Sequence, residues 1–279
     1  MILSLRDLLR MSRYLFLAIL PLILIACSDY NRALKTGDRN YKLKYADEYF
    51  EKDDYMKALP LYEECIPLFR GLTQSEHVYY RYAYCHYGIE DYYLASYYFR
   101  TFAKTYPTGQ YAEEASFLSA LCHYKNSPRW SLDQTDTKRA IDEMQIFMNR
   151  YPHSPKKDTC NVLIDELRYK LEVKQYKTAV QYYKTRKYRA AVIALENVLR
   201  EYPNSEYRED IMYYQLKANF DLATHSVEHK KKERLKNTIG SYHKFVDRYA
   251  SSKKINEAES IYNECIKLLE SYSTNTTEK

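Results

Sequence analysis

The amino-acid sequence predicts an all-α protein built from about five pairs of packed helices, followed by one closing helix. Three observations support this prediction. Apolar residues recur at helical spacing in five separate stretches of the chain. The 279 residues include only 5 Gly and 8 Pro, too few for the many turns of a β-rich fold. The 33 Tyr, against 9 Phe and 1 Trp, suit the half-buried surfaces of stacked helices.

The repeating unit is clearest in the second helix of each pair. Apolar residues follow a small residue at four, seven, eight and eleven positions, which places them on one face of a helix. The five small residues are Ala58, Ala95, Ala140, Ala191 and Thr238. In three units a proline at position twelve ends the helix, because proline lacks an N–H group and clashes with the preceding turn. These prolines are Pro107, Pro152 and Pro203.

The first helix of each pair carries a second small residue, twelve positions before the first one in three units and twenty in the other two. These residues are Ala46, Ala83, Ala120, Ala179 and Ala218. The pattern resembles the tetratricopeptide repeat, in which a small residue allows the two helices of a pair to pack closely. This resemblance implies a right-handed solenoid of helix pairs. The closing helix is expected near Lys254–Leu269.

The N-terminus reads as a targeting segment. Residues 14–26 are apolar but too short to cross a hydrocarbon core of about 30 Å as a helix. They follow basic residues, as in a secretory signal. Leu24-Ile25-Ala26-Cys27 resembles a bacterial lipobox, which implies that residues 1–26 are removed and that Cys27 carries diacylglycerol and a fatty acyl group such as palmitate. Ser28 is not the Asp that retains lipoproteins at the inner membrane, so the resemblance implies the periplasmic face of the outer membrane. Met1 and Met11 are both candidate starts.

The sequence contains no signal for catalysis, a metal or a cofactor. GxGxxG, GxxxxGK[ST], HExxH and GxSxG are all missing. None of the cysteines lies at CxxC spacing, so we predict no metal site. Cys85-His86 and Cys122-His123 have the residue types of a nucleophile and its base, which is the alternative interpretation. They stand at equivalent places in consecutive repeats, where we expect the cysteine to be buried and the histidine ring to pack on the second helix of the pair. The net charge of +6 is too small to indicate a nucleic acid partner.

The first helices of the repeats are expected to line a concave surface. In repeats one to three the positions facing this groove are almost all aromatic or aliphatic, which suits an extended or helical peptide with aromatic side chains. The candidates are Leu43, Phe50, Tyr80, Tyr84, Tyr87, Phe117, Leu121 and Tyr124, with Asp47 as the polar member. The alternative is that some rings only pack on the next repeat. The last two repeats are more polar there, which suits a folded partner.

A basic segment runs from His229 to Arg234, and we expect it to lie in a loop. It is interpreted either as a solvated loop or as a contact with anionic lipid headgroups.

A lipobox followed by five such helix pairs resembles the BamD (ComL) family, the lipoproteins of the β-barrel assembly machinery. The most specific stretch is Ser131–Thr137, followed by Ala140, Phe147 and Tyr151-Pro152. The resemblance implies a non-enzymatic scaffold whose N-terminal repeats receive unfolded outer-membrane proteins. It also implies that the C-terminal repeats bind a POTRA domain of a BamA-like barrel insertase. Better-known members carry an arginine for that contact where this chain has Ala194. Arg186 and Arg189, which lie nearby, are therefore the partner-binding candidates.

The predicted organisation has five parts: a signal peptide (1–26), a lipid-anchored linker (27–40), repeats one to three (41–152), repeats four and five with the closing helix (153–270), and a flexible tail (271–279). Two alternative functions fit the sequence less well. A periplasmic tetratricopeptide lipoprotein that coordinates cell-wall and envelope processes would often carry an N-terminal coiled coil, and Ser28–Lys44 is too short for one. A glycan-binding lipoprotein would be longer and richer in Trp.

Overall fold

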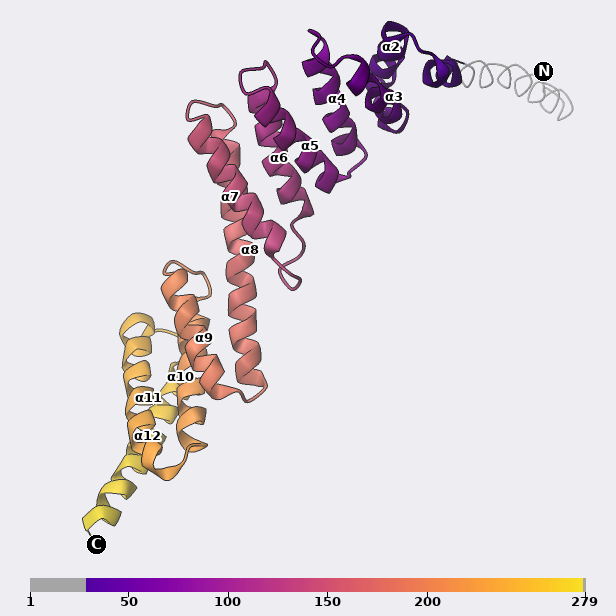
Figure 1. Ribbon diagram of the computed structural model, residues 1–279. Coiled ribbons are helices and arrows are strands. Elements are labelled where there is room, and N and C mark those ends of the chain that lie inside the picture. Colours follow the sequence, from indigo (N-terminus) through magenta and orange to yellow (C-terminus); the bar gives the residue numbers. More distant parts are fainter. Residues whose placement is uncertain (1–28, 278–279) are drawn as a thin grey trace, which may run out of the picture. The chain divides into compact units, whose positions relative to one another are not determined.

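The computed structural model describes residues 29–277, with side chains through Tyr272, and every regular element in this range is a helix (Figure 1). Residues 1–28, which hold the expected signal peptide and Cys27, and residues 278–279 lie outside the described range. The helices are α2 (Arg39–Phe50), α3 (Tyr55–Leu68), α4 (Ser75–Gly88), α5 (Tyr92–Thr105), α6 (Ala112–Asn126), α7 (Thr135–Arg150), α8 (Lys157–Lys184), α9 (Tyr188–Glu201), α10 (Arg208–Thr224), α11 (Glu228–Tyr249) and α12 (Ile255–Thr277).

These helices form the five predicted pairs, from α2–α3 to α10–α11, and α12 follows them as the closing helix. The all-α fold class is therefore confirmed. The predicted small residues explain how the helices pack. All ten of them are between 0% and 1% exposed. A residue without a bulky side chain at these places lets neighbouring helix backbones approach closely.

Three segments differ from the expectation. Residues 29–35, expected to belong to a linker, are helical, and Ala33 is fully buried in the core beside α2 and α3. The basic segment after Val227 forms the first turns of α11 and is not a loop. The helix packs on its neighbours through the buried Leu235 and Thr238, and its first turns continue from that packed part. α12 continues to Thr277, through most of the segment expected to be a tail.

The chain forms two compact units. Unit 1 holds the residues up to Pro128 together with Thr135–Ile164, and unit 2 holds Arg129–Gln134 together with the residues from Asp165 onward. The boundary falls inside α8. Its first half supplies Cys160 and Ile164 to the core of unit 1, and its second half supplies Tyr176 and Ala179 to the core of unit 2. Each unit therefore has its own hydrophobic core.

Candidate functional site

The first helices of repeats one to three, α2, α4 and α6, carry the eight predicted groove residues. Six of these are half-buried: Leu43, Phe50, Tyr84, Tyr87, Leu121 and Tyr124. The other two are core residues, since Tyr80 is 7% and Phe117 8% exposed. The prediction that Tyr80 and Phe117 present a surface to a peptide is therefore wrong.

Contacts with neighbouring helices explain why these two rings are covered. Tyr80 stacks on Tyr111, which precedes α6, with ring centroids 4.3 Å apart and planes at 10°. The Phe117 ring lies 5.6 Å from the Phe147 ring, and the Lys156 ammonium lies 4.8 Å from its centroid. The alternative interpretation, that some rings pack on the following repeat, holds for Tyr80. Phe117 packs on Phe147 of its own repeat, and Lys156 of the following repeat lies over its ring.

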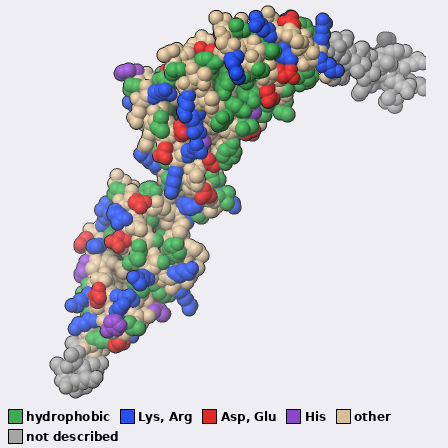
Figure 2. Space-filling view, viewed as in Figure 1, with side chains coloured by type: hydrophobic (Ala, Val, Ile, Leu, Met, Phe, Trp, Pro, Cys, Tyr) green, Lys and Arg blue, Asp and Glu red, His purple; other side chains and the backbone are tan. Residues whose placement is uncertain are grey.

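The half-buried rings of repeats one and two form a continuous aromatic surface, defined here as Phe50, Tyr84 and Tyr87. The Phe50 and Tyr84 centroids are 5.4 Å apart, and those of Tyr84 and Tyr87 are 5.7 Å apart. Phe99 of α5 lies beneath both tyrosines and is fully buried. Hydrophobic side chains gather over α4 and α5 on the face shown in Figure 2. Rings held on a rigid floor and partly open to solvent can pack against an apolar side chain at low entropic cost.

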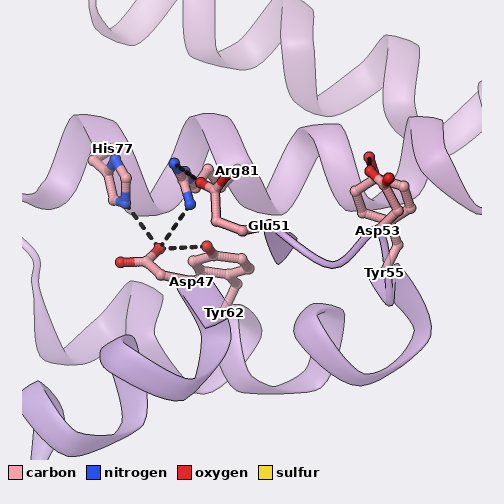
Figure 3. Close-up of polar contacts among 7 residues, drawn as sticks. All are labelled: Asp47, Glu51, Asp53, Tyr55, Tyr62, His77 and Arg81. Carbon is pink, nitrogen blue, oxygen red and sulfur yellow. Dashed lines mark hydrogen bonds and ion pairs between the residues drawn. The ribbon is translucent and has the colours of Figure 1, made fainter. Parts of the chain in front are cut away.

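A polar cluster lies beside the aromatic surface and joins repeats one and two (Figure 3). Asp47 of α2 accepts hydrogen bonds from the Tyr62 hydroxyl at 2.5 Å and from Nε2 of His77 at 2.9 Å. Arg81 of α4 donates to Asp47 at 3.3 Å and pairs with Glu51 at 2.6 Å. The Arg81 guanidinium carbon also lies 4.5 Å from the centroid of Phe50, so the cluster supports the edge of the aromatic surface.

The environment of Asp47 keeps it ionised. Burial alone would raise the pKa of this carboxyl group, but the hydrogen bonds from His77 and Tyr62 and the charge of Arg81 outweigh it, so the pKa lies below its ordinary value. Neither His77 nor Arg81 is among the residues predicted to form the site. Their spacing of four residues places both on one face of α4, but nothing in the sequence shows that this face meets Asp47.

A shallow hollow of about 570 Å³ opens on α2 next to this cluster. Leu43 lies on its lining together with Asp47 and Glu51. An apolar side chain and carboxylates therefore line the same hollow. Such a lining can accept an apolar residue of a peptide that is followed by a hydrogen-bond donor.

Ser96, His123 and Asp136 are arranged like the serine, histidine and aspartate of a hydrolytic triad. The Ser96 hydroxyl lies 2.9 Å from Nε2 of His123, and Nδ1 of His123 lies 3.8 Å from Asp136. However, Ser96 is 1% and His123 3% exposed, between α5 and α6. A substrate cannot reach the Ser96 oxygen, and so the group serves packing and hydrogen bonding, not nucleophilic attack.

The cysteines within residues 29–277 are free and buried. Burial raises the pKa of Cys65, Cys122 and Cys265 to about 12, which makes these thiols poor nucleophiles. No group of three His, Cys, Asp or Glu in the described part of the chain is placed to hold a metal ion. Cys85 and Cys122 are fully buried in consecutive repeats, as their equivalent positions predicted.

His86 packs as an aromatic ring, stacked on Tyr98 at 5.0 Å, and neither of its nitrogens has a hydrogen-bond partner among the described residues. Burial lowers its pKa below the ordinary value of 6.5. The unfolded chain then binds a proton more readily than the folded one. Above a pH of about 6.5 the ring is neutral in both states, and His86 then has no pH-dependent effect on the free energy of unfolding. Below that pH the free energy of unfolding falls, because the unfolded chain takes up a proton that the buried ring does not.

We therefore expect His86→Phe to raise the free energy of unfolding by about 1 kcal/mol at pH 7.5, since it removes two unpartnered buried nitrogens. The gain over wild type should be larger at pH 5.5. Denaturant midpoints at both pH values measure this difference. His153→Gln, at an exposed position, should leave the pH dependence as in the wild type. An equal gain at the two pH values would contradict a neutral His86 in the folded state.

In unit 2, Arg186 and Arg189 are both exposed and line a hollow of about 800 Å³. Tyr188, Ile193 and Leu222 form its apolar part. Arg186 adopts a left-handed backbone conformation, φ 58°, in the turn between α8 and α9. The structure thus brings the two partner-binding candidates to one surface. Their contact with a partner stays a prediction.

Comparison with known proteins identifies the family. A family model described as YfiO, outer membrane lipoprotein, matches residues 38–235, which run from the start of α2 into α11 and include most of both units. The chain belongs to this family. The YfiO model is the BamD family domain, so the resemblance seen in the sequence is supported at the level of the family. No curated protein matches the chain.

Membership in YfiO gives the chain the coarse description of an outer membrane lipoprotein. YfiO is a non-enzymatic lipoprotein family. None of the helices within residues 29–277 is both long and apolar enough to cross a membrane.

Proposed function

We propose that the protein is a non-enzymatic scaffold of the β-barrel assembly machinery, anchored through Cys27 to the periplasmic face of the outer membrane. Unit 1 receives segments of unfolded outer-membrane proteins, and unit 2 binds the periplasmic POTRA region of the barrel insertase. The observation that carries this proposal is the YfiO match over residues 38–235, which includes helices of both units. The lipobox-like residues 24–27 supply the anchor.

The aromatic surface supports the role of unit 1. Segments that will become strands of a membrane barrel carry apolar and aromatic side chains on alternate positions. Phe50, Tyr84 and Tyr87 offer ring faces to such side chains, while Asp47 and Glu51 lie within the adjacent hollow. A surface of half-buried rings binds many related sequences, as a scaffold for different clients requires.

The client-binding site is tested by Tyr84→Ala combined with Tyr87→Ala. We expect the double variant to bind a synthetic peptide of the last strand of a β-barrel protein about tenfold more weakly, because two ring contacts are lost. Fluorescence anisotropy of the labelled peptide measures the affinity. The matched control is Tyr93→Ala with Tyr97→Ala, two tyrosines of the same repeat that are 63% and 58% exposed on α5. Unchanged affinity in a folded double variant, or equal loss in the control, would place the site elsewhere.

The scaffold role is tested by purifying the protein from its native membrane in mild detergent and identifying the proteins that accompany it. Recovery of a POTRA-containing barrel insertase is the expected result. Recovery of cell-wall enzymes without the insertase would instead favour a lipoprotein that coordinates envelope processes. In that case the fold and the family would stand, and the assembly role would be wrong.

A further inference from the structure

One edge of unit 2 is strongly basic. The end of α8, the start of α9, the end of α10 and the start of α11 lie at this edge (Figure 1), where Lys, Arg and His side chains gather on the face shown in Figure 2. The rings of Tyr188 and His225, 5.3 Å apart, connect the α8–α9 turn to the end of α10. We define the basic edge as residues 184–189 and 227–233. Its basic members are Lys184, Arg186, Lys187, Arg189, Lys230, Lys231 and Lys232.

The charge of this edge is large for the chain. It holds seven Lys and Arg against two acidic residues, Glu228 and Glu233, and this excess nearly equals the net charge of +6 of all 279 residues. Of the seven cations only Lys231 forms an ion pair within the described residues, with Glu228 at 3.2 Å. The remaining cations are thus available to an external anionic partner.

The fold does not require these charges. Lys230, Lys231 and Lys232 lie in the first turns of α11, at the positive end of the helix dipole, where a cation is unfavourable by a few tenths of a kcal/mol or more. α9 likewise begins after Lys187, whose side chain makes no capping hydrogen bond. Cations that destabilise the helix ends locally are better explained by binding than by folding.

Exposed apolar side chains accompany the cations. Val227, directly before α11, is 60% exposed, and Ile193 of α9 is 52% exposed. Cations interspersed with exposed apolar residues are typical of surfaces that lie on a bilayer, because headgroups take up the charge and the apolar tips enter the interface.

We propose that the basic edge of unit 2 binds the surface of an anionic lipid bilayer. The chain belongs to an outer membrane lipoprotein family, which holds it at a membrane, and so a bilayer is the anionic surface within reach. The proposal rests on membrane attachment. Since the basic edge includes Arg186 and Arg189, the candidates for the insertase contact, the test changes only the lysines at the start of α11. In this proposal the lysines at the start of α11 contact the bilayer and so orient unit 2 at the membrane.

The test is the partition of the unacylated chain from Ser28 onward, which contains every described helix, onto phosphatidylcholine vesicles with and without 30% phosphatidylglycerol. Sedimentation measures the bound fraction. We expect partition to be at least about tenfold higher on the anionic vesicles and to fall with added salt. Lys230→Gln, Lys231→Gln and Lys232→Gln together should remove most of this preference. These exchanges lie at an unfavourable helix end, so the triple variant should keep its helical content.

The matched control is Lys244→Gln, Arg248→Gln and Lys253→Gln, three exposed cations of unit 2 in or just beyond the C-terminal part of α11, away from its basic start. It changes the net charge equally and should keep the preference for anionic vesicles. Equal partition onto both vesicle types, or equal loss in both triple variants, would overturn the proposal. Displacement from the vesicles by millimolar glycerol phosphate would also overturn it, since that would reveal a compact phosphate site. So would a Lys230–Lys232 variant that keeps vesicle binding but loses the periplasmic region of the insertase.

Discussion

Replacing Phe99 by alanine is expected to destabilise unit 1 by about 3–5 kcal/mol. Phe99 is fully buried in α5, and its ring lies 5.9 Å from Tyr80, 6.4 Å from Tyr84 and 6.5 Å from Tyr87. Its removal leaves a cavity beneath three rings of the neighbouring helix, and these cannot close over it without leaving their own contacts. The aromatic surface should lose its floor, so peptide binding should weaken as well.

Hydrogen exchange resolved by helix measures this effect in the intact chain. We expect faster exchange across α4, α5 and α6, and unchanged exchange in α9, α10 and α11, because unit 2 has a separate core. Tyr97→Ala, four residues after Tyr93 on the exposed face of α5, is the matched control and should change stability by less than about 0.5 kcal/mol. Uniformly faster exchange in both units would contradict two independent cores.

Alanine at Gly88 is expected to destabilise the contact between repeats one and two by about 1–3 kcal/mol. A Cβ atom at this last residue of α4 would lie 2.5 Å from Cγ of Tyr55. The ring has little freedom to move. Its hydroxyl donates to Asp53 at 2.5 Å, and it lies 5.5 Å from Phe50 and 6.0 Å from Tyr84.

The denaturant midpoint of the unit 1 transition measures the cost of this exchange. The control is Gly240→Ala within α11, where a Cβ atom would meet nothing within 4 Å. That exchange should stabilise unit 2 by about 0.5–1 kcal/mol, because alanine favours the helix over glycine. A Gly88→Ala variant as stable as the wild type would show that Tyr55 can move aside.

The repeat was predictable from the sequence because it depends on spacing within single helices. Ala58, Ala95, Ala140, Ala191 and Thr238 recur with the same apolar pattern behind them, and all five are fully buried. The same argument placed Cys85 and Cys122 in the core. Residue spacing predicted the ends of the helices less well. The basic start of α11 looks like a loop in the sequence, whereas in the structure the helix begins at Glu228, about two turns before the buried Leu235.

The candidate site was predictable only in part. The sequence places Tyr80 and Tyr84 four residues apart on one face of a helix, and it cannot tell which of them the next repeat covers. In the structure Tyr111 stacks on Tyr80, while Tyr84 stays half-buried beside Phe50. The contacts of Asp47 with His77 and Arg81 likewise join residues 30 and 34 positions apart, and no local pattern contains them.

The sequence by itself determined the helix pairs, the buried small residues and the resemblance to a lipoprotein family, because each depends on residues close together in the chain. The tertiary structure alone decided that the chain has two cores divided within α8, that Phe50, Tyr84 and Tyr87 share one surface, and that the α8–α9 turn and the start of α11 form one basic edge. These features depend on which side chains of different repeats meet, and on the water that their packing excludes, and neither can be read from spacing within one helix.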